Sequence, residues 1–411
     1  MNILQLSKKF PCPTNDGETM AVMHLSSALH RLGVRQTLLV MSTAKHPASP
    51  ETVARYAGEM AHYEAVKVVE VDTAVRPLAA LRSMAGKGSY NIERFEQDEY
   101  RRALVELLRA HTYDVVQLET LYLAPYIADI RAHSRAKIVL RSHNVEYEIW
   151  ERLAHNGSPL SPKTWYFRLL ATRLRRYETA KLAQPRATGY DAIAAITARD
   201  AEQFAALGSV APVMTLPIGL NLASYPEPLP YPTVPSIGFI GSLDWLPNTE
   251  GLEWFLEHIW AEALRRHPNL TFHIAGRHTP PHFLRLRLPN VVVHGEVPSA
   301  TGFILSHAIS IAPLLSGGGM KVKVLEALAL GRTVIASPVG LEGIEPPDRV
   351  AVLSATTRQE WLEAIDHAVQ HYTTTLPDIG NAARRFVEQR FDNAVIAQQY
   401  LAQLRALVAE A

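Results

Sequence analysis

The segment from Ser316 to Gly340 constrains the fold of this chain more than any other. An apolar run ends at Leu315, three glycines follow at 317–319, and an apolar repeat with helical spacing begins at Val322. Glycine permits positive φ and the close approach of a ligand, while the first turn of a helix presents unpaired N–H groups with partial positive charge. This order of strand, glycine turn and helix predicts an α/β unit with an anion site at the turn.

The polar residues beside this turn fit a phosphate with an attached sugar. Lys321 and Lys323 add two cations near the start of the helix, and Glu326 places a carboxylate about one turn further in. That carboxylate can accept hydrogen bonds from sugar hydroxyls. A nucleotide sugar therefore suits the site, whereas a plain tight turn with solvated lysines is the alternative. The backbone of the turn comes from Gly317, Gly318 and Gly319.

The residues that follow the turn resemble a known family. Gly331 stands where a helix commonly stops, and T-V-I-A-S predicts the next buried strand. The run V-L-E-A-L-A-L-G-R-T-V-I-A-S-P-V-G-L-E-G resembles the donor-binding signature of the retaining glycosyltransferases of family 4, which have the GT-B fold. The resemblance implies an α/β chain of two Rossmann-like parallel-sheet domains that face each other across a cleft. It also implies transfer of a hexosyl group from a nucleotide-diphosphate sugar with retention.

One residue departs from the family pattern. The family usually has two glutamates separated by seven residues; the second matches Glu326, while the first falls at Gly318. A subset that builds bacterial surface glycans has a similar version, with glycine and a basic residue before Lys-x-Leu-Glu-Ala. The resemblance is to this surface-glycan type. Backbone amides and lysines then line the part of the donor site where the first glutamate would lie.

Composition limits the kinds of protein that this chain can be. Its 411 residues, 47% of them hydrophobic, are enough for two domains with a core each. The net charge of +1 gives no overall field for nucleic acid, and the single Cys12 allows no intrachain disulfide. Neither a signal peptide nor a run of about 18 apolar residues occurs. We therefore predict a cytoplasmic protein without a membrane span.

The first residues predict the opening of a parallel α/β sheet. Met1 to Leu6 and Gln36 to Met41 are predicted strands, with a helix between them that Gly33 closes. Gly17, with the preceding Asp16, resembles the glycine loop that the family places beside the acceptor and the donor phosphates. An ordinary turn from strand to helix is the alternative.

Two polar residues follow predicted strands of this first sheet. The strand from Ala136 to Arg141 ends in R-S-H-N-V-E, and His143 lies just past its carboxyl end, where open α/β sheets bind ligands. In the related enzymes a histidine in such a motif faces the sugar. Glu119, after the preceding strand, is a further candidate. A structural role is the alternative for both.

The segment from Lys163 to Arg186 predicts a basic amphipathic helix. It has seven basic residues and one acidic residue, Glu178. Such a helix suits an anionic membrane surface, and many glycosyltransferases with lipid-linked acceptors dock through one. Peripheral contact with the inner face of the cell membrane and packing on the chain's own core are both open. The apolar face would consist of Trp165, Leu169, Leu170, Leu174 and Tyr177.

Prolines separate two predicted domains. The segment L-A-S-Y-P-E-P-L-P-Y-P-T-V-P-S holds five prolines, which neither a helix nor a central strand tolerates. We predict an acceptor-binding domain over 1–215, a linker over 216–235 and a donor-binding domain over 236–390. Helical patterns cover 359–371 and 379–409. The resemblance implies that the last helix, about 390–411, crosses back onto the first domain.

The second predicted domain opens with another glycine turn. Gly238 and Gly241 do not complete G-x-G-x-x-G, which disfavours a dinucleotide-binding dehydrogenase. The stretch instead resembles the second glycine loop of the family. Typical members carry an Arg and a Lys here that hold the diphosphate, whereas this chain has S-L-D from Ser242. Lys321 and Lys323, which follow the glycine turn at 317–319, are expected to supply the missing positive charge.

Two further predicted strands end at the same edge. Thr271 to Ala275 is followed by Gly276 and Arg277, and Val291 to Gly295 leads into Glu296 and Val297. In the family the loop that matches H-G-E-V-P lies against the nucleotide base. Backbone groups of Glu296 and Val297 are therefore predicted to contact the base of the donor.

The reaction follows from the resemblance and from an absent motif. No D-x-D occurs, so no divalent metal or other cofactor is expected, and fixed dipoles and lysines would stabilise the leaving group. The resemblance implies front-face transfer with retention from a UDP- or GDP-sugar to a glycan or lipid-linked acceptor. A nucleotide-sugar 2-epimerase of GT-B fold and a non-catalytic glycan-assembly subunit remain open. These residues do not identify the donor sugar, the acceptor or the linkage.

Overall fold

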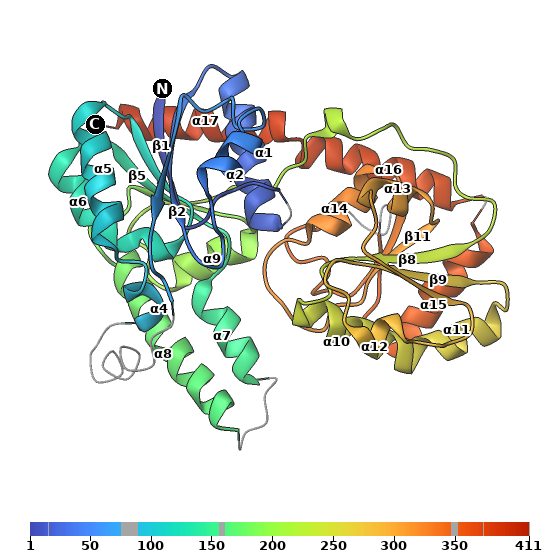
Figure 1. Cartoon of the computed structure of the whole chain (residues 1–411). Coiled ribbons are helices and arrows are strands. Elements are labelled where there is room, and N and C mark those ends of the chain that lie inside the picture. Colours follow the sequence, from blue (N-terminus) through green and yellow to red (C-terminus); the bar gives the residue numbers. More distant parts are fainter. Residues whose placement is uncertain (15, 75–88, 156–160, 347–351, 373, 411) are drawn as a thin grey trace. The chain divides into compact units, whose positions relative to one another are not determined.

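The computed structural model describes residues 1–14, 16–74, 89–155, 161–346, 352–372 and 374–410. Within them the chain forms two compact units. Unit 1 comprises Met1–Gly219 and Asn393–Ala411, and unit 2 comprises Leu220–Asp392 (Figure 1). Each unit is built on its own parallel sheet.

The described part of unit 1 contains a seven-stranded sheet whose neighbouring strands all pair in parallel. Its central strands are short apolar runs, because a parallel sheet is covered on both faces. Ile3 and Leu4 illustrate this, since they enter two different core clusters on opposite faces. In sheet order the strands are β3 (Ala65–Glu70), β2 (Arg35–Ser42), β1 (Asn2–Ser7), β4 (Val115–Leu118), β5 (Lys137–Ser142), β6 (Ala192–Ala195) and β7 (Val213–Thr215).

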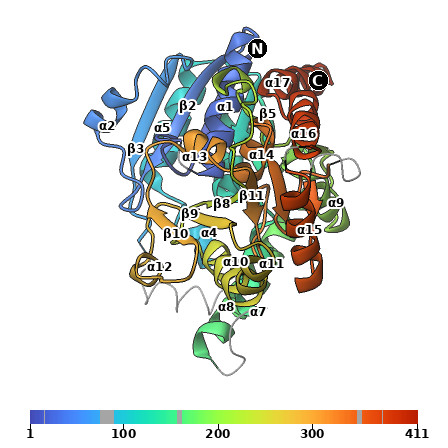
Figure 2. The same ribbon diagram turned by 90° about the vertical axis from the view of Figure 1, so that its right-hand side faces the viewer.

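Helices cover both faces of this sheet. The last helix, α17 (Asn393–Ala409), follows unit 2 in the chain but packs beside α1 (Gly17–Arg31) in unit 1 (Figures 1 and 2). Leu25 and Leu29 of α1 share one apolar cluster with Tyr400 and Leu404 of α17. The other helices of unit 1 are α2 (Pro50–Arg55), α4 (Tyr90–Glu93), α5 (Asp98–Ala110), η1 (Leu121–Tyr126), α6 (Ile127–His133), α7 (Glu146–His155), α8 (Pro162–Leu182) and α9 (Ala198–Ala206).

The described part of unit 2 contains a six-stranded sheet, again parallel throughout. Phe255, Trp260 and Trp361 are buried against one face of it. They come from a continuous helical segment, in which η3 is a π-helical turn between α10 and α11, and from α15. In sheet order the strands are β10 (Val291–Gly295), β9 (Thr271–Ala275), β8 (Ser236–Ile240), β11 (Ile309–Ala312), β12 (Thr333–Ala336) and β13 (Val352–Ser354).

The other face of this sheet carries α13, α14 and α16 (Figure 1). The helices of unit 2 are η2 (Leu222–Ser224), α10 (Leu246–Phe255), η3 (Leu256–Trp260), α11 (Ala261–Arg266), α12 (Pro281–Leu284), α13 (Ala300–Leu305), α14 (Val322–Ala329), α15 (Arg358–Gln370) and α16 (Leu376–Arg390). Among the described helices of both units, none combines the length and the apolar composition that a bilayer crossing requires.

The predicted class, α/β with two parallel sheets, is confirmed, but the helical pattern over 379–409 is not one helix. Helix α16 ends at Arg390 and α17 begins at Asn393. Between them Asp392 forms a parallel bridge with Leu220, whose N–H donates to the carbonyl of Phe391 at 2.8 Å. This pairing with a distant segment interrupts a run whose local pattern is helical throughout.

Candidate functional site

The predicted glycine turn at 317–319 leads from β11 into α14. Gly317 and Gly319 have φ of +109° and +70°, a region that favours glycine. The hydroxyl of Ser316 holds the loop, because it donates to Glu250 Oε2 at 2.8 Å. Helix α14 starts at Val322, where the apolar repeat begins. The predicted order of strand, glycine loop and helix is therefore present.

Lys321 makes its contacts within this loop. Its ammonium donates to the carbonyl of Gly318 at 3.1 Å and to that of Gly319, and it lies 3.6 Å from Glu342 Oε2. It is also the N-cap residue of α14, and its side chain makes no capping hydrogen bond. Its charge therefore lies beside the first turn of the helix but is shared with oxygens of the loop itself.

Lys323 joins the two predicted glycine loops. Its ammonium donates to Asn248 Oδ1 at 2.7 Å, and the amide of Asn248 donates to the carbonyl of Ser242, also at 2.7 Å. The same ammonium lies 4.2 Å from the centroid of the Phe239 ring. It also borders Gly241, where an added Cβ would come within 3.3 Å of it. The structure thus brings Lys323, Gly241 and Ser242 together.

The surroundings of Lys323 change its protonation. Burial, followed by the nearby charge of Lys321, lowers the pKa of Lys323 to about 7. An amide oxygen and an aromatic ring are the partners that the structure gives it, and neither carries a full negative charge. An anion bound at this place would favour the protonated ammonium.

The second glycine loop packs against the loops that follow β9 and β10. The N–H of Gly276 donates to the carbonyl of Gly295 at 2.8 Å, and that of Leu243 donates to the carbonyl of Arg277 at 2.9 Å. Gly276 has no room for a side chain, because a Cβ there would lie 2.1 Å from the carbonyl oxygen of Gly241. Close packing of backbone therefore defines this edge of the sheet.

Arg277, Glu296 and Val297 lie at the same edge, after adjacent strands. Glu296 is exposed, whereas Arg277 and Val297 are half-buried. In the second glycine loop, Ser242 Oγ donates to Asp244 Oδ1 at 2.6 Å, and this bond lowers the pKa of Asp244. A carboxylate therefore stands where the family resemblance places basic residues.

Glu326 has a partner that the sequence did not reveal. Its Oε1 accepts a hydrogen bond of 3.0 Å from the hydroxyl of Tyr225, and burial raises the pKa of Glu326. Burial, and then the charge of Glu326, raise the pKa of Tyr225 as well. A ribose hydroxyl at this carboxylate would share it with the tyrosine.

In unit 1, the loop between β1 and α1 is a charged cluster. Gly17 is the first residue of α1, and Asp16 caps the helix. Lys9 Nζ lies 2.9 Å from Asp16 Oδ2 and 3.3 Å from Glu18 Oε2, and Lys8 Nζ lies 3.5 Å from the same oxygen of Glu18. Burial would raise the pKa of Glu18, but the two lysines lower it to about 2.

The two candidates at the strand ends of unit 1 contact each other. His143 Nε2 lies 3.1 Å from Glu119 Oε2, and Arg141 Nη1 lies 3.5 Å from the same oxygen. Glu119 is completely buried, and His143 is 9% exposed. Burial would raise the pKa of Glu119, but Arg141 and His143 outweigh it and lower the pKa to about 2.

The predicted basic helix is α8, which ends at Leu182. Leu170 and Leu174 are buried within unit 1, and Tyr177 packs partly buried against the same core as Leu174, so part of the apolar face packs on the chain's own core. Trp165 is different, because it is 67% exposed. Contact of this helix with a membrane stays a prediction.

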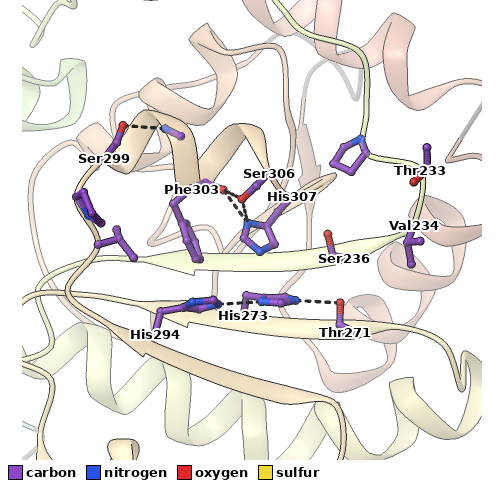
Figure 3. A pocket seen from close by; sticks show the side chains of 14 residues that line it. Thr233, Val234, Ser236, Thr271, His273, His294, Ser299, Phe303, Ser306 and His307 are labelled. Carbon is purple, nitrogen blue, oxygen red and sulfur yellow. Dashed lines mark hydrogen bonds between the residues drawn. The ribbon is translucent and has the colours of Figure 1, made fainter.

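A cavity of about 680 Å³ lies on one face of the sheet of unit 2 (Figure 3). His273 of β9, His294 of β10 and His307 after α13 line it. His273 Nδ1 lies 2.9 Å from His294 Nε2, and His307 Nδ1 donates to the carbonyl of Phe303 at 2.7 Å. The lining includes Val297 but not the glycine loops, so this cavity is separate from the predicted phosphate site.

Part of unit 2 matches a known family model. Residues 234–371 match the family model described as Glycosyl transferases group 1. A Klebsiella pneumoniae protein, "Uncharacterized 44.6 kDa protein in cps region", is 23% identical over 264 residues, which cover 60% of this chain. The match spans 63% of the length of that relative. The domain match supports a glycosyltransferase.

Solved structures resemble the chain over its full length. The sucrose-phosphate synthase of Thermosynechococcus elongatus has a TM-score of 0.67 at 15% identity and covers 100% of both chains. Alr3699/HepE of Anabaena, in complex with UDP-glucose, has a TM-score of 0.65 at 16% identity over 99% of this chain and 100% of that one. The fold is GT-B. The prediction of two parallel-sheet α/β domains of the GT-B type is thereby confirmed.

Several residues of the site were not predicted. Asn248 contacts Lys323, and Tyr225, from the predicted linker, contacts Glu326. A signal for Asn248 exists, because a polar residue that follows a glycine turn in the first turn of a helix is well placed to reach the loop. No local signal marks Tyr225, since its partner lies 101 residues away.

The histidines of the cavity predict how stability depends on pH. Burial, His307 and His294 lower the pKa of His273 from its ordinary 6.5 to about 4. Between these values the unfolded chain binds a proton that the folded protein does not. The free energy of unfolding should therefore be highest above about pH 6.5 and should fall as the pH approaches 4. His273→Asn should reduce that fall, measured by denaturant unfolding at several pH values.

His155→Asn is the matched control, because His155 is exposed at the last residue of α7. This control should keep the wild-type dependence on pH. The same dependence in His273→Asn as in the wild type would contradict the prediction.

Proposed function

We propose that this chain is a retaining hexosyltransferase of family 4, of the bacterial surface-glycan type. It moves a sugar from a UDP- or GDP-sugar to a hydroxyl of a glycan or lipid-linked acceptor. The glycosyl transferases group 1 domain over residues 234–371 supports the class of reaction. The complex of a structural neighbour with UDP-glucose supports the class of donor.

The observation that carries the proposal is the position of Lys323. Its half-buried ammonium joins two glycine loops at the carboxyl edge of a parallel sheet and has an amide oxygen and a ring as partners. Withdrawing a cation from water without an anionic partner is costly, and a bound diphosphate would offset that cost. The N-terminal end of α14 adds the partial positive charge of a helix dipole.

The proposed mechanism is front-face transfer. The acceptor hydroxyl attacks the anomeric carbon on the side from which the diphosphate leaves, and a diphosphate oxygen takes the hydroxyl proton. One C–O bond forms as another breaks on the same face, so the configuration is retained. Lys323 and the loop amides stabilise the developing charge on the leaving group. Glu326 holds the ribose, and His143 faces the sugar, as in the enzymes that the chain resembles.

The remaining assignments extend the same proposal. Arg277, Glu296 and Val297 contribute to the donor site, and Gly17 lies beside the acceptor. Because the sequence has no D-x-D, catalysis proceeds without a divalent metal. We place the protein in the cytoplasm, in peripheral contact with the inner face of the membrane through residues 163–186. The exposed Trp165 supports this contact.

Incubation with UDP- and GDP-sugars tests the function directly. Release of the nucleoside diphosphate should be slow with donor alone, faster with an alcohol acceptor, and unchanged by EDTA. A rate that EDTA abolishes and Mg²⁺ restores would overturn the metal-independent mechanism. An epimerised donor without acceptor would identify a 2-epimerase, and the absence of any turnover would identify a non-catalytic subunit.

Lys323→Ala should lower the maximal rate by about 100-fold or more, the scale of a lost preorganised donor to a developing anion. Lys323→Met keeps an unbranched side chain of similar length beside Phe239 and should show the same loss, which separates charge from packing. Lys321→Ala is the comparison, because its ammonium bonds to the loop, and it should retain more activity. If the Ala variants of both lysines turn over at the wild-type rate, the diphosphate is held elsewhere.

Glu326→Ala should weaken binding of a nucleoside diphosphate by about 1–3 kcal/mol, the scale of a lost hydrogen bond to a charged group. Isothermal titration calorimetry with UDP and GDP measures this. Tyr225→Phe is the matched control, since it removes the partner hydroxyl but keeps the carboxylate. Unchanged affinity in Glu326→Ala would reject the contact with ribose.

A further inference from the structure

The carboxylate of Glu119 lies inside a buried ring of donors in unit 1. Its Oε1 accepts hydrogen bonds from the side-chain amides of Gln5 and Gln117. Its Oε2 faces Arg141 and His143. All five side chains are at most 9% exposed. Which ring nitrogen of His143 carries the proton therefore depends on the group that residue 119 presents to it.

Two tyrosines orient the amides. The hydroxyl of Tyr63 donates to Gln5 Oε1 at 2.7 Å, and that of Tyr400, from α17, donates to Gln117 Oε1 at 2.8 Å. The NH₂ groups of both amides therefore face Glu119, and this is the only orientation that a carboxylate tolerates, because it accepts and cannot donate.

The same rule applies to the histidine. Since Glu119 Oε2 can only accept, His143 must donate its Nε2–H to it across 3.1 Å. In the neutral ring, Nδ1 then carries the lone pair. This Nδ1 is buried and has no hydrogen-bond partner among the described residues. Buried polar atoms are normally paired, so an unpaired acceptor at the carboxyl end of a strand indicates a place for a ligand's donor.

We propose that Glu119 is a positioning residue, which fixes His143 as the Nε2–H tautomer so that Nδ1 accepts a hydrogen bond from a sugar hydroxyl. The inference rests on the proposed function for the identity of the hydroxyl. The tautomer itself rests on the network alone. Glu119 does not touch the substrate and acts through the histidine.

Glu119→Gln tests the inference with little change in shape. Gln5 and Gln117 both donate toward the Oε1 position, so the oxygen of the new amide is held there. Its NH₂ group then takes the Oε2 position, beside Arg141 and His143, and donates to Nε2, which moves the ring proton to Nδ1. Arg141 Nη1 keeps its hydrogen bond of 2.9 Å to the carbonyl of Ala21. Replacing an orienting carboxylate by an amide can in this way impose the wrong tautomer while the geometry survives.

The tautomer is read by NMR of protein labelled with ¹⁵N-histidine. The chain has 17 histidines, so the spectrum of His143→Asn identifies the signals of His143. The wild type should show the proton on Nε2, and Glu119→Gln should show it on Nδ1. Tyr400→Phe is the matched control, because it removes a hydroxyl from the same network but keeps the carboxylate. It should keep the Nε2–H form.

The transfer rate gives the second readout. In Glu119→Gln, kcat/KM for sugar transfer should fall by about 10- to 100-fold, because a buried acceptor has become a donor. A wild-type His143 with its proton on Nδ1 would overturn the inference without any variant. A Glu119→Gln protein with an unchanged tautomer would also overturn it, as would a changed tautomer with an unchanged rate. If the wild type transfers no sugar, the proposed function fails, and the nitrogen shifts still decide the tautomer.

Discussion

Parallel pairing of the strands determines where the candidate residues lie. In a parallel sheet the carboxyl ends of all strands meet at one edge, so loops that are distant in sequence become neighbours. In unit 2 this brings Arg277 and Glu296 to the edge that also carries Gly241. In unit 1 it places His143 and Glu119, 24 residues apart, within 3.1 Å. A ligand site then requires only that the side chains at this edge suit the ligand.

The features that the sequence predicted well are those with local causes. Three glycines before an apolar helical repeat predicted the turn at 317–319, and the structure has positive φ at Gly317 and Gly319. Short apolar runs bounded by turns predicted parallel strands, because such strands are buried on both faces. Charged residues after those strands predicted His143 and Glu119 as candidates, since strand ends are visible without knowing the partner.

What the sequence did not predict depends on partners far along the chain. Tyr225 bonds to Glu326 across 101 residues, and Asn248 bonds to Lys323 across 75. The break between α16 and α17 has the same origin, because Asp392 pairs with Leu220 while its own neighbourhood is helical in pattern. Burial lowers the pKa of Lys323, whose ammonium contacts Asn248 of α10 and Phe239 of β8. Periodicity and composition carry none of this information.

The place of α17 has a consequence for synthesis of the protein. Domains generally fold from the N-terminus as the ribosome releases the chain. Leu25, Leu29 and Val139 of unit 1 share an apolar cluster with residues of α17. That helix is translated only after all of unit 2. During this interval the nascent first sheet exposes an apolar face, which makes it a surface for chaperones or for aggregation. The order of the chain thus places completion of the first core after the synthesis of unit 2.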